Sequence, residues 1–94
     1  MGKYFVEIEK DAKKDIQKIY KSGNKADIKR LEQIISELSK NPRIGIGNPE
    51  RLKHHGDEEF WSRQLNKKDR ILYQIIENEV VVIVVSALGH YKDK

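Results

Sequence analysis

The spacing of apolar residues changes once along this chain, and the change restricts the folds that are open to it. Between residues 11 and 38, apolar residues recur at the three- and four-residue intervals of an amphipathic helix. After residue 50 they alternate with polar residues or run together in stretches of six, as in β-strands. The turns between these stretches are too short for a crossover, so we expect the strands to pair antiparallel.

The first half of the chain is expected to form one strand and two helices. Alternation over residues 4–8 predicts a short first strand. Helical spacing begins at Asp11, and Gly23 stands where the end of a helix favours a residue with positive φ. Asn24 can cap a second helix, whose end is signalled by Asn41 before a proline, a position that disfavours helical backbone. The two helices are expected to form an antiparallel hairpin.

The second half is expected to form a meander of strands. Two glycines and two prolines between residues 42 and 49 predict a connecting loop. The order strand, helix, helix, meander predicts an α+β fold, a two-layer sandwich in which the helical hairpin covers one face of a mainly antiparallel sheet of four to five strands. The strands of the meander are expected at residues 51–54, 60–65, 71–76 and 80–85.

Length and composition exclude several classes of protein. The 94 residues predict one domain over positions 1–94. Cysteine is absent, which excludes disulfides, a thiolate nucleophile and a Cys-ligated metal. The longest aliphatic run, residues 80–85, is far shorter than the roughly 18 residues of a membrane helix, and the N-terminus lacks a signal peptide, so a cytoplasmic protein without a membrane partner is expected. The net charge of +4 weakly favours an anionic partner.

Polar residues that could carry chemistry gather in the second half. Because the ends of antiparallel strands lie close together, we expect an acid, guanidinium groups, an imidazole and a phenol to converge on one patch. Such a set suits cleavage of RNA by its own 2′-hydroxyl, which needs a base, an acid and cations for the charge that develops on phosphate, and requires no metal or cofactor. The residues of this set are Glu50, Lys53, His54, His55, Arg63, Arg70, His90 and Tyr91.

Each role has a structural alternative. Glu50 can be the base or only a solvated turn residue, and Arg70 can stabilise phosphate or pair with the preceding Asp69. Trp61, like Tyr91, offers a face on which a base can stack, but tryptophan is more often a core residue. His90 can be the acid or a solvated residue beyond the last strand.

The same residues carry a resemblance to a known family. The matching residues lie between about 45 and 91. They are Gly45-x-Gly47-x-Pro49-Glu50-x-Leu52-Lys53-His54, then Phe60-Trp61-Ser62-Arg63, then Arg70-Ile71-Leu72-Tyr73, and last His90-Tyr91. With these motifs the chain resembles the bacterial type II toxins of the RelE/ParE superfamily and, within it, the Txe/YoeB branch.

The resemblance implies a fold, an activity and partners. It implies a microbial ribonuclease-like fold and a ribosome-dependent endoribonuclease, or mRNA interferase, that cuts mRNA in the A site of the 70S ribosome and is neutralised by a cognate acidic antitoxin. Both a monomer and a homodimer are compatible with the sequence. By position, the resemblance implies Glu50 as general base, Arg70 as the phosphate-stabilising arginine, His90 as general acid and Tyr91 beside it, with Lys53, His54, Trp61 and Arg63 as RNA-binding residues.

Two other functions fit the same fold. A non-catalytic toxin of this fold can instead inhibit DNA gyrase, and such relatives lack the catalytic set. An RNA-binding module could use the same basic and aromatic residues without cutting. One departure from the branch is the tail of residues 92–94, which follows the His-Tyr pair that otherwise ends the chain.

Overall fold

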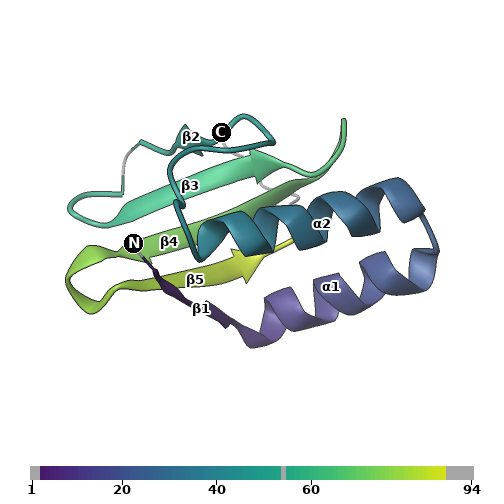
Figure 1. The fold of residues 1–94 in the computed structure, drawn as a ribbon, viewed down its shortest axis with the longest axis horizontal. Coiled ribbons are helices and arrows are strands. Elements are labelled where there is room, and N and C mark those ends of the chain that lie inside the picture. Colours follow the sequence, from purple (N-terminus) through teal and green to yellow (C-terminus); the bar gives the residue numbers. More distant parts are fainter. Residues whose placement is uncertain (1–2, 54, 89–94) are drawn as a thin grey trace.

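The computed structural model describes residues 3–53 and 55–88, so the predicted site residues His54, His90 and Tyr91 lie outside the described residues. The order of elements is the one expected from the sequence (Figure 1). The elements are β1 (Phe5–Ile8), α1 (Lys10–Ser22), α2 (Lys25–Leu38), β2 (Glu50–Arg51), β3 (Glu59–Gln64), β4 (Arg70–Ile76), the 3₁₀ turn η1 (Glu77–Glu79) and β5 (Val81–Ser86).

The five strands form one sheet in the order β1-β5-β4-β3-β2. The pairs β2–β3, β3–β4 and β4–β5 are antiparallel, as the short turns predicted. The first strand instead pairs parallel with the last, with Phe5 opposite Val81. The helical hairpin covers one face of this sheet, which confirms the two-layer α+β sandwich (Figure 1).

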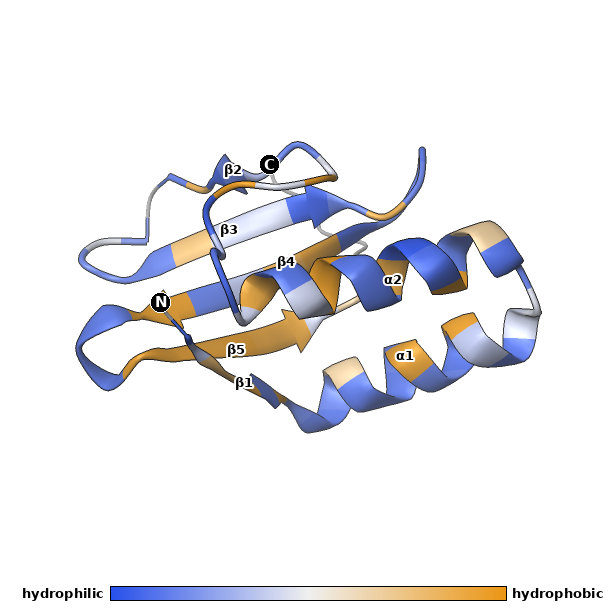
Figure 2. Ribbon diagram, viewed as in Figure 1, coloured by the Kyte–Doolittle hydropathy of each residue, from blue (hydrophilic) through white to orange (hydrophobic). Residues whose placement is uncertain are grey.

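The core lies between the hairpin and the sheet. Alternation along β4 directs Ile71, Tyr73 and Ile75 toward the helices, where all three are buried. The side of α2 that faces them buries Leu31 and Ile34. Figure 2 shows β5 as apolar along its length and the helices as apolar on one side. Each such side chain contributes about 1.5–3 kcal/mol on full burial, so this layer holds the molecule together.

The ends of the two helices follow the expected signals, with one difference. Gly23 adopts φ 72 at the end of α1, and the Asn24 side chain accepts a hydrogen bond from the Asp27 N–H at 3.1 Å. The second helix ends at Leu38, three residues before Asn41. The Ser39 carbonyl accepts the Tyr4 N–H at 2.7 Å, which joins this end of α2 to β1.

Two strand predictions were wrong in their limits. The strand expected at 51–54 is only the two residues Glu50–Arg51. The last strand begins at Val81, because Val80 has φ 58 and donates its N–H to the Glu77 carbonyl, which closes the turn before β5. No helix within residues 3–53 and 55–88 is long and apolar enough to cross a bilayer.

Candidate active site

Glu50 and Arg70 meet on the sheet face that the helices leave open. Glu50 lies opposite Ser62 in the β2–β3 pair, and Arg70 opens β4 opposite Gln64. The Arg70 Nη1 atom lies 3.7 Å from the Glu50 Oε1 atom and donates a hydrogen bond to the Ser62 Oγ atom at 3.0 Å. The expected convergence of a carboxylate and a guanidinium is therefore present in the fold.

Solvent reaches both charged side chains of this pair. The Glu50 side chain is 60% exposed and the Arg70 side chain 34%. At 3.7 Å the ion pair is too long for a strong hydrogen bond, and exposed pairs add little stability, about 0–1 kcal/mol. A carboxylate so placed can accept a proton, and a guanidinium beside it can hold a phosphate through several N–H donors.

Ser62 is a site residue that the sequence analysis missed. It is 2% exposed, and its hydroxyl is the acceptor that orients Arg70. The sequence gives little indication of this role, because serine is common in strands. The role becomes visible only when the strand register places Ser62 opposite Glu50. Only the pairing of three strands reveals that Ser62 lies between Glu50 and Arg70.

Arg63 is in the interior, so its prediction as a surface cation that holds RNA was wrong. Its side chain is fully buried on the helix-facing side of β3. The Nη1 atom donates to the Glu37 Oε1 atom at 2.6 Å, and the Nη2 atom to the Ile44 carbonyl at 2.8 Å. The other acceptors of this guanidinium are the Tyr73 hydroxyl and the carbonyls of Asn41, Pro42 and Ile46.

The Arg63 contacts join α2 to the loop that leads to Glu50. Burial raises the pKa of Glu37, but hydrogen bonds from the Ile46 N–H and the Arg63 guanidinium outweigh it, so the pKa lies below its ordinary value. Glu37 therefore stays ionised opposite Arg63. The loop is held from both ends, because Gly47 also accepts the Gln64 N–H at 2.7 Å.

Gly47 lets this loop lie directly on β3. It has φ +83, and a Cβ atom there would stand 2.9 Å from the Gln64 carbonyl oxygen. A side chain at this position would push the loop away from the strand. Close packing against β3 thus explains the glycine at position 47.

Trp61 and Lys53 differ in where they lie relative to the Glu50–Arg70 pair. Trp61 shares the helix-facing side of β3 with Arg63, packs on the core, and donates its indole N–H to the Glu59 Oε2 atom at 2.8 Å. Alternation places Trp61 on the face of β3 opposite to Glu50, and base stacking on its ring stays a prediction. Lys53 is exposed and follows β2 on the same edge of the sheet as Glu50.

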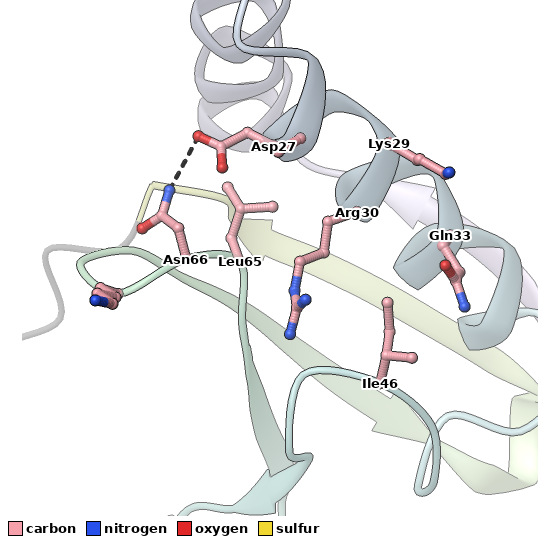
Figure 3. A pocket seen from close by; sticks show the side chains of 9 residues that line it. Asp27, Lys29, Arg30, Gln33, Ile46, Leu65 and Asn66 are labelled. Carbon is pink, nitrogen blue, oxygen red and sulfur yellow. Dashed lines mark hydrogen bonds between the residues drawn. The ribbon is translucent and has the colours of Figure 1, made fainter.

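A hollow of about 470 Å³ lies on the helix side, between α2 and the β3–β4 turn (Figure 3). Arg30 points into it between Leu65 and Ile46, and its Nε atom donates to the Gln64 carbonyl at 3.3 Å. A hydrogen bond of 3.0 Å from the Asn66 amide to Asp27 closes one end. This hollow is separate from the Glu50–Arg70 pair, which lies on the other face.

Within the described ranges, no group of three or more His, Cys, Asp or Glu side chains is arranged to hold a metal ion.

The geometry can be compared with known proteins. The chain is 32% identical over 73 residues to the toxin YoeB of a Synechocystis strain, an overlap that covers 78% of this chain and 81% of that protein. Its fold matches the YoeB dimer of Staphylococcus aureus with a TM-score of 0.75 at 23% identity, over 95% of this chain and 99% of that one. It also matches the heterotetrameric YoeB-YefM toxin-antitoxin complex of S. aureus, with a TM-score of 0.71 at 25% identity, over 94% and 98% of the two chains.

The family match covers nearly the whole chain. The family of "YoeB-like toxin of bacterial type II toxin-antitoxin system" matches residues 8–91, which include both helices, the whole sheet except the first three residues of β1, and the Glu50–Arg70 pair. The resemblance first suggested by short motifs in the second half thus extends through the helical hairpin. The chain belongs to the YoeB-like toxins of bacterial type II toxin-antitoxin systems.

Proposed function

We propose that this toxin is a ribosome-dependent endoribonuclease that cuts mRNA in the A site without a metal ion. The observation that supports it most directly is the Glu50–Arg70 pair, in which a solvated carboxylate lies 3.7 Å from a guanidinium oriented by Ser62. A base and a cation for phosphate are what attack by a 2′-hydroxyl requires.

The reaction assigns one task to each group. As the 2′ oxygen forms its bond to phosphorus, its proton passes to Glu50, and Arg70 compensates the charge on the phosphate oxygens. The bond from phosphorus to the 5′ oxygen breaks, and that oxygen takes a proton from His90. The products are a 2′,3′-cyclic phosphate and a 5′-hydroxyl end. Tyr91 is proposed to position the RNA, while Lys53 and His54 hold its backbone.

The proposed partners are mRNA on the ribosome and an acidic antitoxin in the same cytoplasm. The S. aureus YoeB structures include a complex with YefM and a dimer. For this chain we expect an antitoxin that covers the Glu50–Arg70 face with its own Asp and Glu residues, so that RNA cannot reach Arg70. A homodimer that leaves this face open is compatible with the same function.

Primer extension on mRNA after a pulse of expression tests the proposal. Wild type is expected to produce new 5′ ends at a fixed position within codons, and Glu50→Gln is expected to lower their yield about 100-fold or more, the usual effect of losing a general base. Glu58→Gln is the matched control, because Glu58 is also an exposed glutamate near β3.

Other outcomes separate the alternatives. Cleavage by Glu50→Gln at the wild-type rate contradicts the assigned base. DNA damage without new mRNA ends indicates a gyrase-directed toxin, and RNA binding without new ends indicates a binding module.

A further inference from the structure

Two aromatic rings stack on one another close to the Glu50–Arg70 pair and have no role in the proposed reaction. The centroids of the His55 and Phe60 rings lie 4.6 Å apart, with 31° between the ring planes. This separation is that of a stacked aromatic pair. Both side chains are partly exposed, so the pair keeps ring surface that a further flat group can cover.

Phe60 lies on the open face of the sheet, which is also the face of the reactive pair. Side chains alternate along β3, so Phe60 shares its side with Ser62, whereas Trp61 packs against the core on the other side. The Leu52 N–H donates to the Phe60 carbonyl at 2.8 Å, which holds the chain after β2 beside the ring. Phe60 and Ser62 are two residues apart in one strand, so their Cα atoms are separated by about 6.5 Å. The ring pair therefore begins one short step from the residue that orients Arg70.

The charges around the rings favour an uncharged group over a phosphate. Gln74 lies opposite Phe60 in the β3–β4 pair. From there to the end of β4, away from Arg70, a hollow of about 490 Å³ is lined by acidic residues that include Asp57 and Glu58. A polyanionic chain is attracted at Arg70 and repelled at this acidic end of the sheet. Its phosphates are thus expected beside Arg70, and an uncharged base is the part of the chain that can cover the rings.

We propose that the stacked rings of His55 and Phe60 form a platform for one unpaired base of the RNA, next to the phosphate that Arg70 holds. Aromatic side chains are a common means of binding single-stranded RNA, and the loss of one stacked base lowers affinity about 5- to 150-fold. The inference rests on the proposed function and adds to it the contact that places a base beside the scissile bond. Because every base has a flat face, this contact selects single strands over duplexes and accepts any base.

The test is single-turnover cleavage of ribosome-bound mRNA in which a base beside the cut is present or removed. Two abasic mRNAs are compared with the intact one, each lacking the base of one of the two nucleotides that flank the scissile phosphate. On intact mRNA, with toxin below saturation, Phe60→Leu is expected to slow cleavage about 5- to 150-fold, as the loss of one stacked base does. On one of the abasic mRNAs wild type is expected to be slowed to the same extent, and Phe60→Leu is expected to slow it no further than about twofold.

Phe5 provides the matched control. It is the other of the two phenylalanines and is 74% exposed, but it lies on β1, at the far edge of the sheet from β2. Phe5→Leu is expected to cleave all three mRNAs like wild type. Phe60→Tyr and His55→Phe keep both rings and are expected to stay within about threefold of wild type on intact mRNA, whereas His55→Ala is expected to show part of the Phe60→Leu defect.

Two results of the cleavage assay would overturn the platform. One is cleavage of intact mRNA by Phe60→Leu at the wild-type rate. The other is an equal slowing by Phe60→Leu on the intact mRNA and on both abasic mRNAs, which indicates damage to the fold in place of a lost base contact.

A binding measurement separates the platform from the proposed reaction. The probe is ribosome-bound mRNA that carries 2-aminopurine, a base whose fluorescence falls on stacking, at the position identified by the abasic mRNAs or, if none is cleaved, at each flanking position in turn. Glu50→Gln toxin is expected to lower this fluorescence, and the double variant with Phe60→Leu is expected to leave it high. If wild type leaves mRNA intact while the fluorescence falls in this way, the proposed reaction fails and the platform stands. Fluorescence that is equal with and without Phe60→Leu refutes the platform, whether or not mRNA is cut.

Discussion

Replacement of Arg63 by methionine distinguishes an arginine that supports the fold from one that binds RNA. Methionine keeps the length and the apolar stem of the side chain but removes a fully buried guanidinium. It leaves the Glu37 carboxylate, whose side chain is only 26% exposed, without its 2.6 Å partner, and leaves the carbonyls of the loop without a donor. Removing one member of a buried ion pair costs about 3–5 kcal/mol.

A loss of that size is a large fraction of the total stability. A domain of this length is stable by about 5–15 kcal/mol, and each kcal/mol moves Tm by roughly 4–8 °C. Arg63→Met is therefore expected to lower Tm by about 12 °C or more. Thermal unfolding followed by circular dichroism measures the change, and a urea titration gives the free energy of unfolding independently.

Arg43→Met is the matched control for this experiment. Arg43 also pairs with two carboxylates, those of Glu59 and Glu77, but its side chain is 35% exposed. Water can therefore replace part of the lost hydrogen bonds, and we expect the free energy of unfolding to fall by only about 1 kcal/mol. The reasoning on Arg63 is refuted if Arg63→Met unfolds within about 1 kcal/mol of wild type. If Arg63→Met keeps normal stability but loses RNA binding, Arg63 contacts RNA and does not support the fold.

Three further predictions follow from single contacts. Ser62→Ala removes the hydroxyl that orients Arg70, so we expect about a tenfold lower kcat with little change in KM in single-turnover and steady-state cleavage assays. The Arg43 guanidinium holds the pKa of Glu59 below its ordinary value, so the stability this contributes is present above the unfolded-state pKa and is lost as pH falls through the lower folded-state value. The free energy of unfolding should therefore decline in wild type below about pH 4.5, and Glu59→Gln should flatten that decline in urea titrations across acidic pH. Val80 adopts φ 58, which costs a β-branched residue about 1–2 kcal/mol, so Val80→Asn should raise the free energy of unfolding by about 0.5–1 kcal/mol; an unchanged or lower value contradicts strain at this turn.

Much of the fold was predictable because its signals are local. The period of apolar residues, a glycine after one helix and an asparagine before the next each act within a few residues of their own position. The parallel pairing of β1 with β5 has no such local signal, because the pattern of apolar residues within a strand does not determine which strand lies beside it. The sharp turn at Val80 was missed for a related reason, since a valine in an apolar run is typical of a strand.

The candidate site was predictable in part. Glu50 and Arg70 were expected to converge, and they do, but the 3.7 Å between them depends on the register of three strands. The burial of Arg63 could have been predicted, because it stands two residues before Leu65 and so shares the core-facing side of the strand. Its charge instead favoured an exposed position. The alternation of residues in β3 predicts a buried Arg63, whereas its charge predicts an exposed one. The alternation was the better guide, because six acceptors compensate the buried guanidinium.

The place of β5 in the sheet has a consequence for the order in which a nascent chain can fold. β1 and α1 are synthesised first, yet both lie against β5, the last strand of the described chain to be made. Until residues 81–86 have left the ribosome, α1 lacks the strand against which it mainly packs. The chain therefore completes its core in one late step, and contacts between residues far apart in sequence make that step slow compared with helix formation. β1 therefore stays without its neighbour in the sheet until β5 has been made, whereas the strands that carry Glu50, Ser62 and Arg70 are made earlier.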